Sequence, residues 1–121
     1  MPRRSLLLTP EVCSWLSALA DDDFGQVAWY LDLLCERGGR LAEPHSRALR
    51  GRLRQLEVPG HRRTRQLTYY LDGEQAVVLL TIWRRWRPRR RELERAVAAL
   101  HRQPRKGRTE RSRDGSPRPV G

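Results

Sequence analysis

An arginine cluster follows directly on the most apolar stretch of the chain. Residues 76–83 (AVVLLTIW) are apolar at nearly every position, and residues 84–91 (RRWRPRRR) then carry six arginines in eight positions. An apolar run without polar alternation predicts a strand inside a sheet, covered on both faces. Because the arginine cluster follows this strand directly, it would place fixed positive charge at one edge of the sheet. Because the planar guanidinium group can donate two hydrogen bonds to phosphate oxygens, the cluster favours phosphate binding over a merely solubilising role.

The charge of the whole chain also points to a polyanionic partner. The 121 residues include 25 Lys and Arg against 14 Asp and Glu, a net charge of +11, and residues 44–103 alone carry +10. This balance predicts nucleic acid as the first partner and a membrane surface as the second. No apolar run is long enough to span a membrane, and residues 1–9 are too short for a signal peptide. We therefore expect a cytoplasmic protein that is not inserted in a membrane.

The cysteines and histidines give no pattern for a metal site. The chain has two cysteines, Cys13 and Cys35, and three histidines. None of them is grouped with metal-ligand spacing, and two cysteines do not make a disulfide framework. We expect no metal site.

The first forty residues predict a strand followed by a helix hairpin. Residues 3–8 form the strand, Thr9 is the expected N-cap of the first helix, and Pro10 suits its first position. Apolar residues then recur at helical spacing in two stripes. The acidic run 21–23 separates the two helices and favours the start of the second one, which Gly38 and Gly39 end.

The rest of the domain predicts three more strands and a last helix. The strands are residues 50–58, 62–71 and 76–83, with Asp72–Gly73 as a hairpin turn, and the helix is 88–103. The predicted fold is α+β: an antiparallel sheet of about four strands, the N-terminal helix hairpin packed on it, and a C-terminal helix. Residues 1–103 form one domain, and the basic, apolar-poor residues 104–121 form a disordered tail.

Five short motifs, in this order, resemble the RelE/HigB family of bacterial toxins in its phage-derived branch. They lie at residues 8–12 (LTPEV), 49–53 (LRGRL), 65–70 (RQLTYY), 78–85 (VLLTIWRR) and 91–96 (RELERA). The resemblance covers about residues 5–103. It implies a RelE-like domain that acts as a ribosome-dependent mRNA endoribonuclease, needs no metal or small-molecule cofactor, and is neutralised by a cognate antitoxin protein.

The resemblance also implies a set of site residues. In this chemistry the ribose 2′-OH attacks the adjacent phosphate, and the site must stabilise the charge that develops there. Arg65, Arg84 and Arg85 match the family's basic positions, and we expect them to grip the phosphate and stabilise the transition state. Further RNA contacts are expected from other arginines, namely Arg50, Arg52, Arg54, Arg63, Arg87 and Arg89.

Two departures from the family pattern leave alternatives open. Gln55 and Glu57 stand where the family usually carries a basic residue, and no tyrosine follows Tyr70. Glu57 could serve as the general base, with Tyr69, His61 and His101 as other candidates for proton transfer. The alternatives in function are an inactive relative that binds RNA or antitoxin, and a ParE-like toxin that acts on a protein such as DNA gyrase. The arginine cluster argues against the second alternative.

Overall fold

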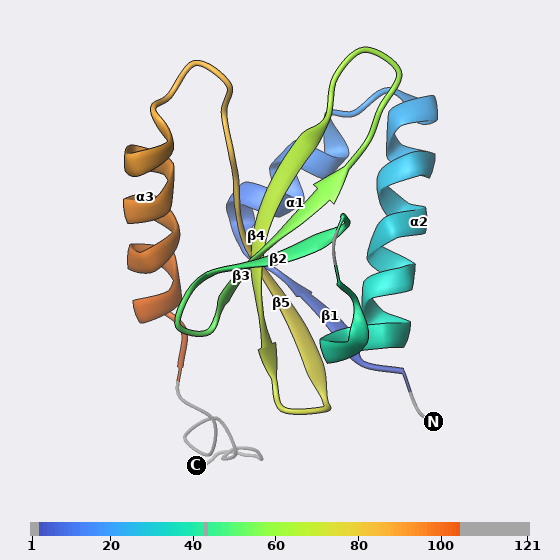
Figure 1. Cartoon of the computed structure of the whole chain (residues 1–121). Helices are drawn as coiled ribbons and strands as arrows, with labels where there is room; N and C mark the ends of the chain where they lie inside the picture. Colours follow the sequence, from blue (N-terminus) through green and yellow to red (C-terminus); the bar gives the residue numbers. More distant parts are fainter. Residues whose placement is uncertain (1–2, 43, 105–121) are drawn as a thin grey trace.

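The fold is built on strand β5 (Ala76–Ile82), in which every residue is buried. The computed structural model describes residues 3–42 and 44–104. Within them the chain forms five strands, three α-helices and one 3-10 helix (Figure 1). The other elements are β1 (Ser5–Leu8), α1 (Pro10–Ser17), α2 (Asp21–Arg37), η1 (Gly38–Arg40), β2 (Ser46–Arg50), β3 (Leu53–Val58), β4 (Arg65–Asp72) and α3 (Arg89–His101). The predicted α+β class and the buried strand are confirmed.

The sheet differs from the prediction in strand number and direction. Its five strands lie in the order β1-β5-β4-β3-β2, and β1 runs parallel to β5 while the other neighbours are antiparallel. The expected antiparallel sheet of about four strands is therefore wrong in detail. The predicted strand 50–58 is interrupted at Gly51, whose φ of 54° makes a turn between two paired strands. The extra strand, Ser46–Arg50, shares only Arg50 with the predicted strand 50–58.

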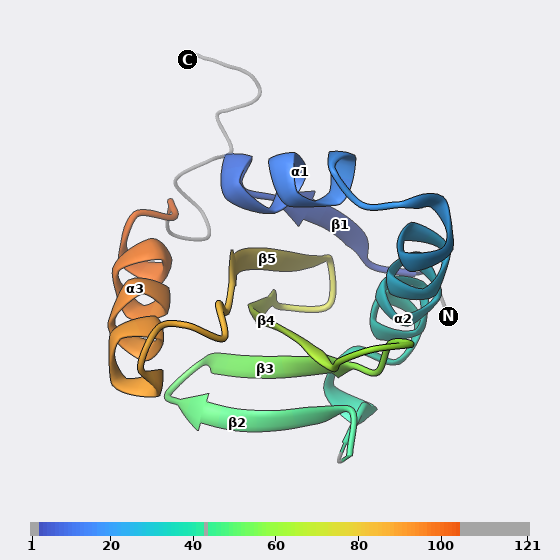
Figure 2. The same ribbon diagram turned by 90° about the horizontal axis from the view of Figure 1, so that it is seen from above.

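Helices cover both faces of the sheet (Figure 2). Val12 of α1 and several residues of α2 join one buried cluster with alternate residues of β3, β4 and β5, among them Leu56, Leu67 and Leu79. Ala96 and Ala99 of α3 join a second cluster with Leu53, Tyr70, Val78 and Leu80 on the opposite face. Helices α1 and α2 thus pack on one face of the sheet, and α3 covers the other.

The start of α1 is fixed as the sequence predicts. The Thr9 hydroxyl accepts a hydrogen bond from the Val12 N–H, and Pro10 occupies the first helical turn. The same hydroxyl donates to the Leu80 carbonyl oxygen over 2.8 Å, so the cap also ties α1 to β5. Residues 105–121, most of the predicted tail, lie outside the described residues.

The two leucines Leu79 and Leu7 offer a matched test of the buried core. Leu79 is fully buried under α1 and α2, whereas Leu7 on the neighbouring strand is 51% exposed. Leu79→Ala is expected to lower the free energy of unfolding by about 2–5 kcal/mol, because it removes buried methyl groups and leaves a cavity. Leu7→Ala should cost less than about 1 kcal/mol. Urea unfolding measures both, and equal losses would contradict the packing described here.

Candidate functional site

The predicted catalytic arginines meet at one end of the sheet. The β3–β4 loop, the start of β4 and the segment between β5 and α3 all lie there (Figure 1). Three cavities open between these segments. The large cavity, of about 750 Å³, is lined by Ala20, Asp22, Asp23, His61, Arg62, Arg63, Arg65 and Arg85. The arginine cavity, of about 110 Å³, is lined by Trp15, Arg63, Thr64, Arg65, Ile82, Trp83, Arg84, Arg85 and Trp86.

The third cavity lies at the start of α3 and is called the α3 cavity here. It measures about 140 Å³ and is lined by Thr64, Gln66, Trp83, Arg84, Arg85, Arg87, Arg89 and Glu92. Arg85 lines all three cavities. The structure thus brings together the predicted residues Arg63, Arg65, Arg84 and Arg85, with Arg87 and Arg89 beside them.

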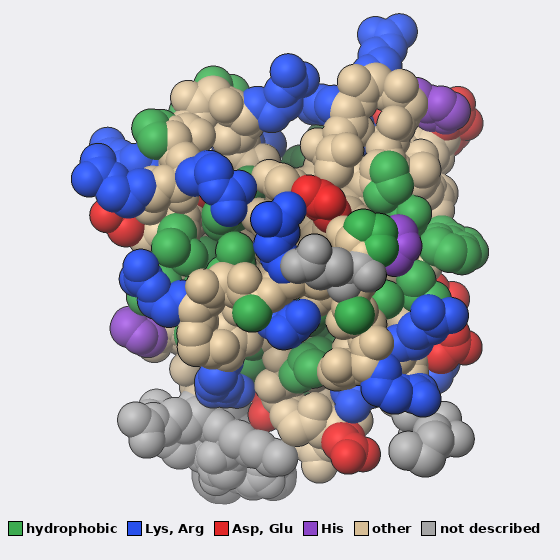
Figure 3. Space-filling model, viewed as in Figure 1, with side chains coloured by type: hydrophobic (Ala, Val, Ile, Leu, Met, Phe, Trp, Pro, Cys, Tyr) green, Lys and Arg blue, Asp and Glu red, His purple; other side chains and the backbone are tan. Residues whose placement is uncertain are grey.

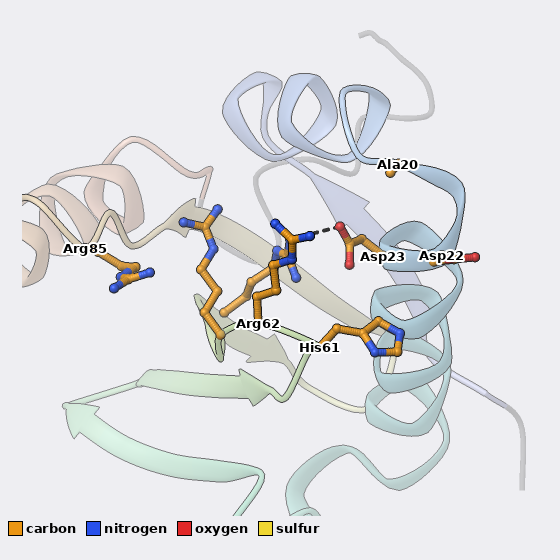
Figure 4. A pocket seen from close by; sticks show the side chains of 8 residues that line it. Ala20, Asp22, Asp23, His61, Arg62 and Arg85 are labelled. Atoms are coloured by element: carbon orange, nitrogen blue, oxygen red, sulfur yellow. Dashed lines mark hydrogen bonds and ion pairs between the residues drawn. The ribbon is translucent and has the colours of Figure 1, made fainter.

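The large cavity has a basic side and an acidic side. Figure 4 shows Arg85 entering from the segment before α3, while Asp22 and Asp23 stand on α2 across the opening. Arg62 and His61 from the β3–β4 loop lie between them. In the space-filling view, basic side chains are spread over the visible face and flank a hollow at the top of the molecule (Figure 3). This end of the sheet therefore presents several guanidinium groups, with the Asp23 carboxylate facing them.

Arg65 is largely enclosed by the protein. Its side chain is 14% exposed, and its Nη2 donates to the Asp23 carboxylate over 3.1 Å. The β3–β4 loop folds closely over it at Gly60. A Cβ at Gly60 would lie 2.7 Å from the Arg63 carbonyl oxygen and 2.9 Å from Arg65 Nη1, too close for any other residue without a shift. Glycine at this position lets the loop approach Arg65.

The segment that carries Arg84 and Arg85 is anchored by buried Glu92. The Glu92 carboxylate accepts hydrogen bonds from the Arg84 backbone N–H, from Arg87 Nη1 over 3.3 Å and from Arg95 Nε over 2.8 Å. Arg95 also donates two hydrogen bonds to Glu11, over 3.0 and 2.9 Å, and one to the Ile82 carbonyl oxygen. This network joins α1, the end of β5 and α3, and it fixes the direction in which the arginine segment leaves the sheet.

The network shifts the pKa of its three charged groups. Burial raises the pKa of the Glu11 carboxyl, but hydrogen bonds from Arg95 and the Ile82 N–H outweigh burial, so that pKa lies below its ordinary value. The Glu92 pKa is lowered in the same way, with burial opposed by Arg95 and the Arg84 N–H. Hydrogen bonding to Glu11 is the largest of the effects that raise the pKa of Arg95. All three groups are therefore charged at neutral pH.

Glu57 is near the site but on the other face of the sheet from Arg65. Its neighbour Val58 pairs with Arg65 and packs in the cluster under α1 and α2, so alternation along β3 turns Glu57 toward the α3 side. Its carboxylate accepts from Gln66 Nε2 over 3.1 Å and from Arg47 over 3.4 Å. Gln66 lines the α3 cavity, so Glu57 lies behind that cavity and does not line any of the three.

Three of the expected RNA-binding arginines lie away from the cavities. Arg50 and Arg52 flank the β2–β3 turn, at the end of β3 remote from Arg65. The Arg52 guanidinium lies 4.6 Å from the centre of the Tyr70 ring, and Arg54 Nε donates to the Ser46 hydroxyl over 3.1 Å. These contacts hold the side chains on the protein surface and in the sheet. Any RNA contact there would be separate from the main site.

The other candidates for proton transfer are placed differently. Tyr69 is fully buried, and its hydroxyl is hydrogen bonded to Ser46. His101 lies in the last turn of α3, whereas His61 lines the large cavity beside Arg63, Arg65 and Arg85. Of the candidates named from the sequence, His61 alone shares a cavity with the expected catalytic arginines.

Sequence reasoning missed several residues that shape the site. The acidic run was interpreted only as a helix start, yet Asp23 also pairs with Arg65. Glu11, Glu92 and Arg95 lie in the first and last of the five motifs, but nothing local indicated that they meet. Trp83 was counted with the apolar run, and it lines two of the cavities.

Comparison with known proteins does not narrow the choice of ligand. No protein-family model matches the chain, and no curated protein matches it. Among residues 3–42 and 44–104, no three His, Cys, Asp or Glu side chains are grouped so that they could hold a metal ion. No helix in the described part of the chain is both long and apolar enough to cross a membrane. The fold and the site thus define a small α+β protein with an arginine-lined cleft.

The Glu11–Arg95–Glu92 network predicts loss of stability in acid. Both carboxyl groups have a pKa below the ordinary 4.5 in the folded state, so the unfolded chain binds protons first as the pH falls. The contribution to stability is complete above pH 4.5 and is lost as the pH falls through the folded-state values. Urea unfolding between pH 7 and pH 3 should show this decline.

A matched pair of variants tests the source of the acid effect. Glu92→Gln removes one buried carboxylate and should lower the free energy of unfolding at pH 7 by about 1–3 kcal/mol, with a shallower dependence on pH. Glu94→Gln changes an exposed residue of the same helix and should keep the wild-type dependence. If the free energy of unfolding of Glu92→Gln depended on pH as it does in the wild type, the Glu92 carboxylate would not be a source of the acid effect.

Proposed function

We propose that this chain is a toxin of the RelE/HigB type, a ribosome-dependent endoribonuclease that cleaves mRNA without a metal ion. The observation that carries the proposal is the convergence of Arg63, Arg65, Arg84 and Arg85 around the arginine cavity. They come from two chain segments that the sequence separates and the sheet brings together. A gathering of guanidinium groups at one cleft suits a phosphodiester better than a protein surface.

The order of elements supports a RelE-like domain. A first strand, a helix hairpin, consecutive strands and a closing helix follow one another as the five motifs imply, with β2 as an addition. Arg65 lies at the start of β4 and the Arg84–Arg85 pair follows β5, which supports their assignment as the basic residues of such a site. The partners under this proposal are mRNA on the ribosome and a cognate antitoxin protein, and the place of action is the cytoplasm.

The arginines would act on the charge of the transition state. The 2′-oxygen bonds to phosphorus as its proton leaves, and the bond to the 5′-oxygen then breaks, giving a cyclic phosphate and a 5′-OH. The phosphorane between these steps carries extra negative charge, which preorganised guanidinium groups stabilise. Arg85 is exposed and forms no ion pair with any residue that the structure describes, whereas Arg65 is held by Asp23. Arg85 is therefore the more available group for binding, and Arg65 the more rigidly placed one.

Proton transfer needs a separate group, because arginine stays protonated in proteins. We assign His61 as the first candidate, since it lines the large cavity with Arg65 and Arg85. Glu57 is the second candidate. To reach the substrate from the α3 side of the sheet, its carboxylate would have to give up its hydrogen bond from Gln66.

Arg85→Ala tests the main assignment. Induced expression in a bacterial host without the antitoxin gene should arrest growth and create new mRNA 5′ ends inside translated codons. Arg85→Ala is expected to reduce the cleavage rate about 10²–10³-fold, since it removes a donor to the developing charge. Arg65→Ala should do the same while losing the ion pair to Asp23, so its thermal unfolding must be measured beside its activity.

Arg102→Ala is the control, because Arg102 is an exposed residue at the far end of α3. It should arrest growth like the wild type. Full toxicity in both Arg85→Ala and Arg65→Ala would refute the site assignment. Growth arrest without new 5′ ends would indicate a protein target such as gyrase. Folded protein that causes no growth arrest would indicate a relative that does not cleave RNA.

His61→Gln and Glu57→Gln separate the two candidates for proton transfer. Loss of a general base or acid costs about 10²–10⁴-fold in rate. We expect a loss of this size in His61→Gln and a change of less than about tenfold in Glu57→Gln, measured as single-turnover cleavage of mRNA on purified ribosomes. The reverse order of the two losses would assign the role to Glu57.

A further inference from the structure

Trp83, a residue that lines the α3 cavity, carries a buried hydrogen-bond donor that no described residue accepts. The donor is its indole N–H, and the residue is 9% exposed. The backbone N–H of Trp83 is satisfied by the Gln66 carbonyl oxygen over 2.9 Å, so only the indole donor is left over. Buried donors in native proteins are nearly always paired, and an unpaired one beside a cavity indicates a missing acceptor.

The start of α3 lacks an anion of its own. Pro88 at the N-cap offers no side-chain hydrogen bond, and the first three helical residues are all arginine. Cations at this end oppose the helix dipole, and the first N–H groups of a helix have no partner within it. Glu92, the acidic residue in the first turn, directs its carboxylate to the Arg84 N–H, Arg87 and Arg95 instead. In α3 the Arg91 and Glu92 N–H groups bond to the Pro88 carbonyl oxygen, so only the Arg89 and Arg90 N–H groups lack a partner among the described residues. The helix start therefore combines these two donors with positive charge that no carboxylate of its own compensates.

The lining of the cavity selects the ligand chemistry. Arg84, Arg85, Arg87 and Arg89 surround it, and the carboxylate of Glu92 is neutralised by its own ion pairs with Arg87 and Arg95. The Arg89 guanidinium lies 4.9 Å from the centre of the Trp83 ring, which places a cation against the indole. A volume of about 140 Å³ lies below the roughly 300 Å³ of the smallest ordinary ligand pockets, so a single compact anionic group fits better than a nucleotide.

We propose that the α3 cavity is a second phosphate-binding subsite, in which the Trp83 indole N–H, the backbone N–H of Arg89 and the side chains of Arg84, Arg87 and Arg89 hold a backbone phosphate of RNA. The proposal rests on the proposed function and extends it. Because Arg84 and Arg85 line both the α3 cavity and the arginine cavity, one strand can place a phosphate in each. The scissile phosphate would lie beside Arg65, and the other would set the register of the strand.

The indole N–H of Trp83 can be observed directly by NMR. The chain has four tryptophans, and in ¹⁵N-labelled protein each gives one indole signal, assigned by Trp→Phe substitution. The probes are inorganic phosphate and a 2′-O-methyl RNA oligomer, which cannot be cleaved. The Trp83 signal should shift saturably with both probes, and at a lower concentration of RNA because RNA fills both subsites. The Trp29 signal should not shift, because Trp29 lies on α2 and lines none of the three cavities.

Two variants test the donors separately by their effect on the dissociation constant of the same RNA. Trp83→Phe keeps the ring and removes the donor, and should weaken binding about tenfold, as expected for a hydrogen bond to a charged acceptor. Its control is Trp29→Phe. Arg89→Gln should weaken binding by a similar factor and also reduce the slope of log Kd against log salt by about 0.7, the value for one phosphate contact on a single strand.

Arg102→Gln is the control for Arg89→Gln, because it removes the same charge from the opposite end of the same helix. It should leave both affinity and slope unchanged. Arg89 is exposed, so its substitution tests the proposal even if Trp83→Phe fails to fold. Equal RNA affinity in Arg89→Gln and Arg102→Gln, or no shift of the Trp83 signal with either probe, would overturn the subsite.

The outcomes also separate this proposal from the proposed function. If inorganic phosphate binds as tightly as RNA, the cavity is a site for a small free anion, and the RNA subsite is overturned. If RNA shifts the Trp83 signal but expression causes no mRNA cleavage, the subsite stands and the nuclease proposal fails. If cleavage occurs and proceeds equally well in Trp83→Phe and Arg89→Gln, the nuclease proposal stands and the subsite fails.

Discussion

The arginine segment after β5 depends on one ion network centred on Arg95. This side chain reaches Glu11 at the start of α1, Glu92 in the first turn of α3 and the Ile82 carbonyl oxygen at the end of β5. Removing one member of a buried network leaves another charge without its partner, and that loss exceeds the net worth of the intact pair. The network therefore acts less as a source of stability than as a constraint: it specifies one path for the chain between β5 and α3. The direction of Arg84 and Arg85 follows from that path.

Gathering so many guanidinium groups at one end of a small sheet has an electrostatic cost. The groups repel one another and raise the local potential, which favours an incoming polyanion and disfavours the empty fold. Two carboxylates moderate this repulsion from inside the protein: Asp23 pairs with Arg65, and Glu92 pairs with Arg87. The other arginines at this end carry their charge toward solvent. The positive charge of the cleft is thus balanced by carboxylates inside the protein, and it is left unbalanced where a ligand can reach it.

Local signals in the sequence predicted most of the helices, strands and turns. Contacts between residues far apart in the sequence could not be predicted from such signals. The cap at Thr9 and Pro10, the buried run of β5 and the turn at Asp72–Gly73 each have a signal within a few residues. Strand β2 has no apolar run of its own, and the parallel pairing of β1 with β5 joins residues far apart in sequence. For the site, the arginine run after the buried strand indicated phosphate binding, and the family resemblance singled out Arg84 and Arg85. The pairing of Asp23 with Arg65, and the face on which Glu57 lies, required the register of the sheet.

The parallel pairing of β1 with β5 has a consequence for synthesis of the chain. Strand β1 is made first, yet its partner appears only after β2, β3 and β4, and the network around Arg95 must wait for α3. Contacts of such long sequence separation form late, because the intervening loop must first be closed at an entropic cost. The nascent chain therefore cannot assemble the arginine cleft while it is still being translated through its first strands. The cleft becomes ordered only when nearly the whole domain, α3 included, has emerged from the ribosome.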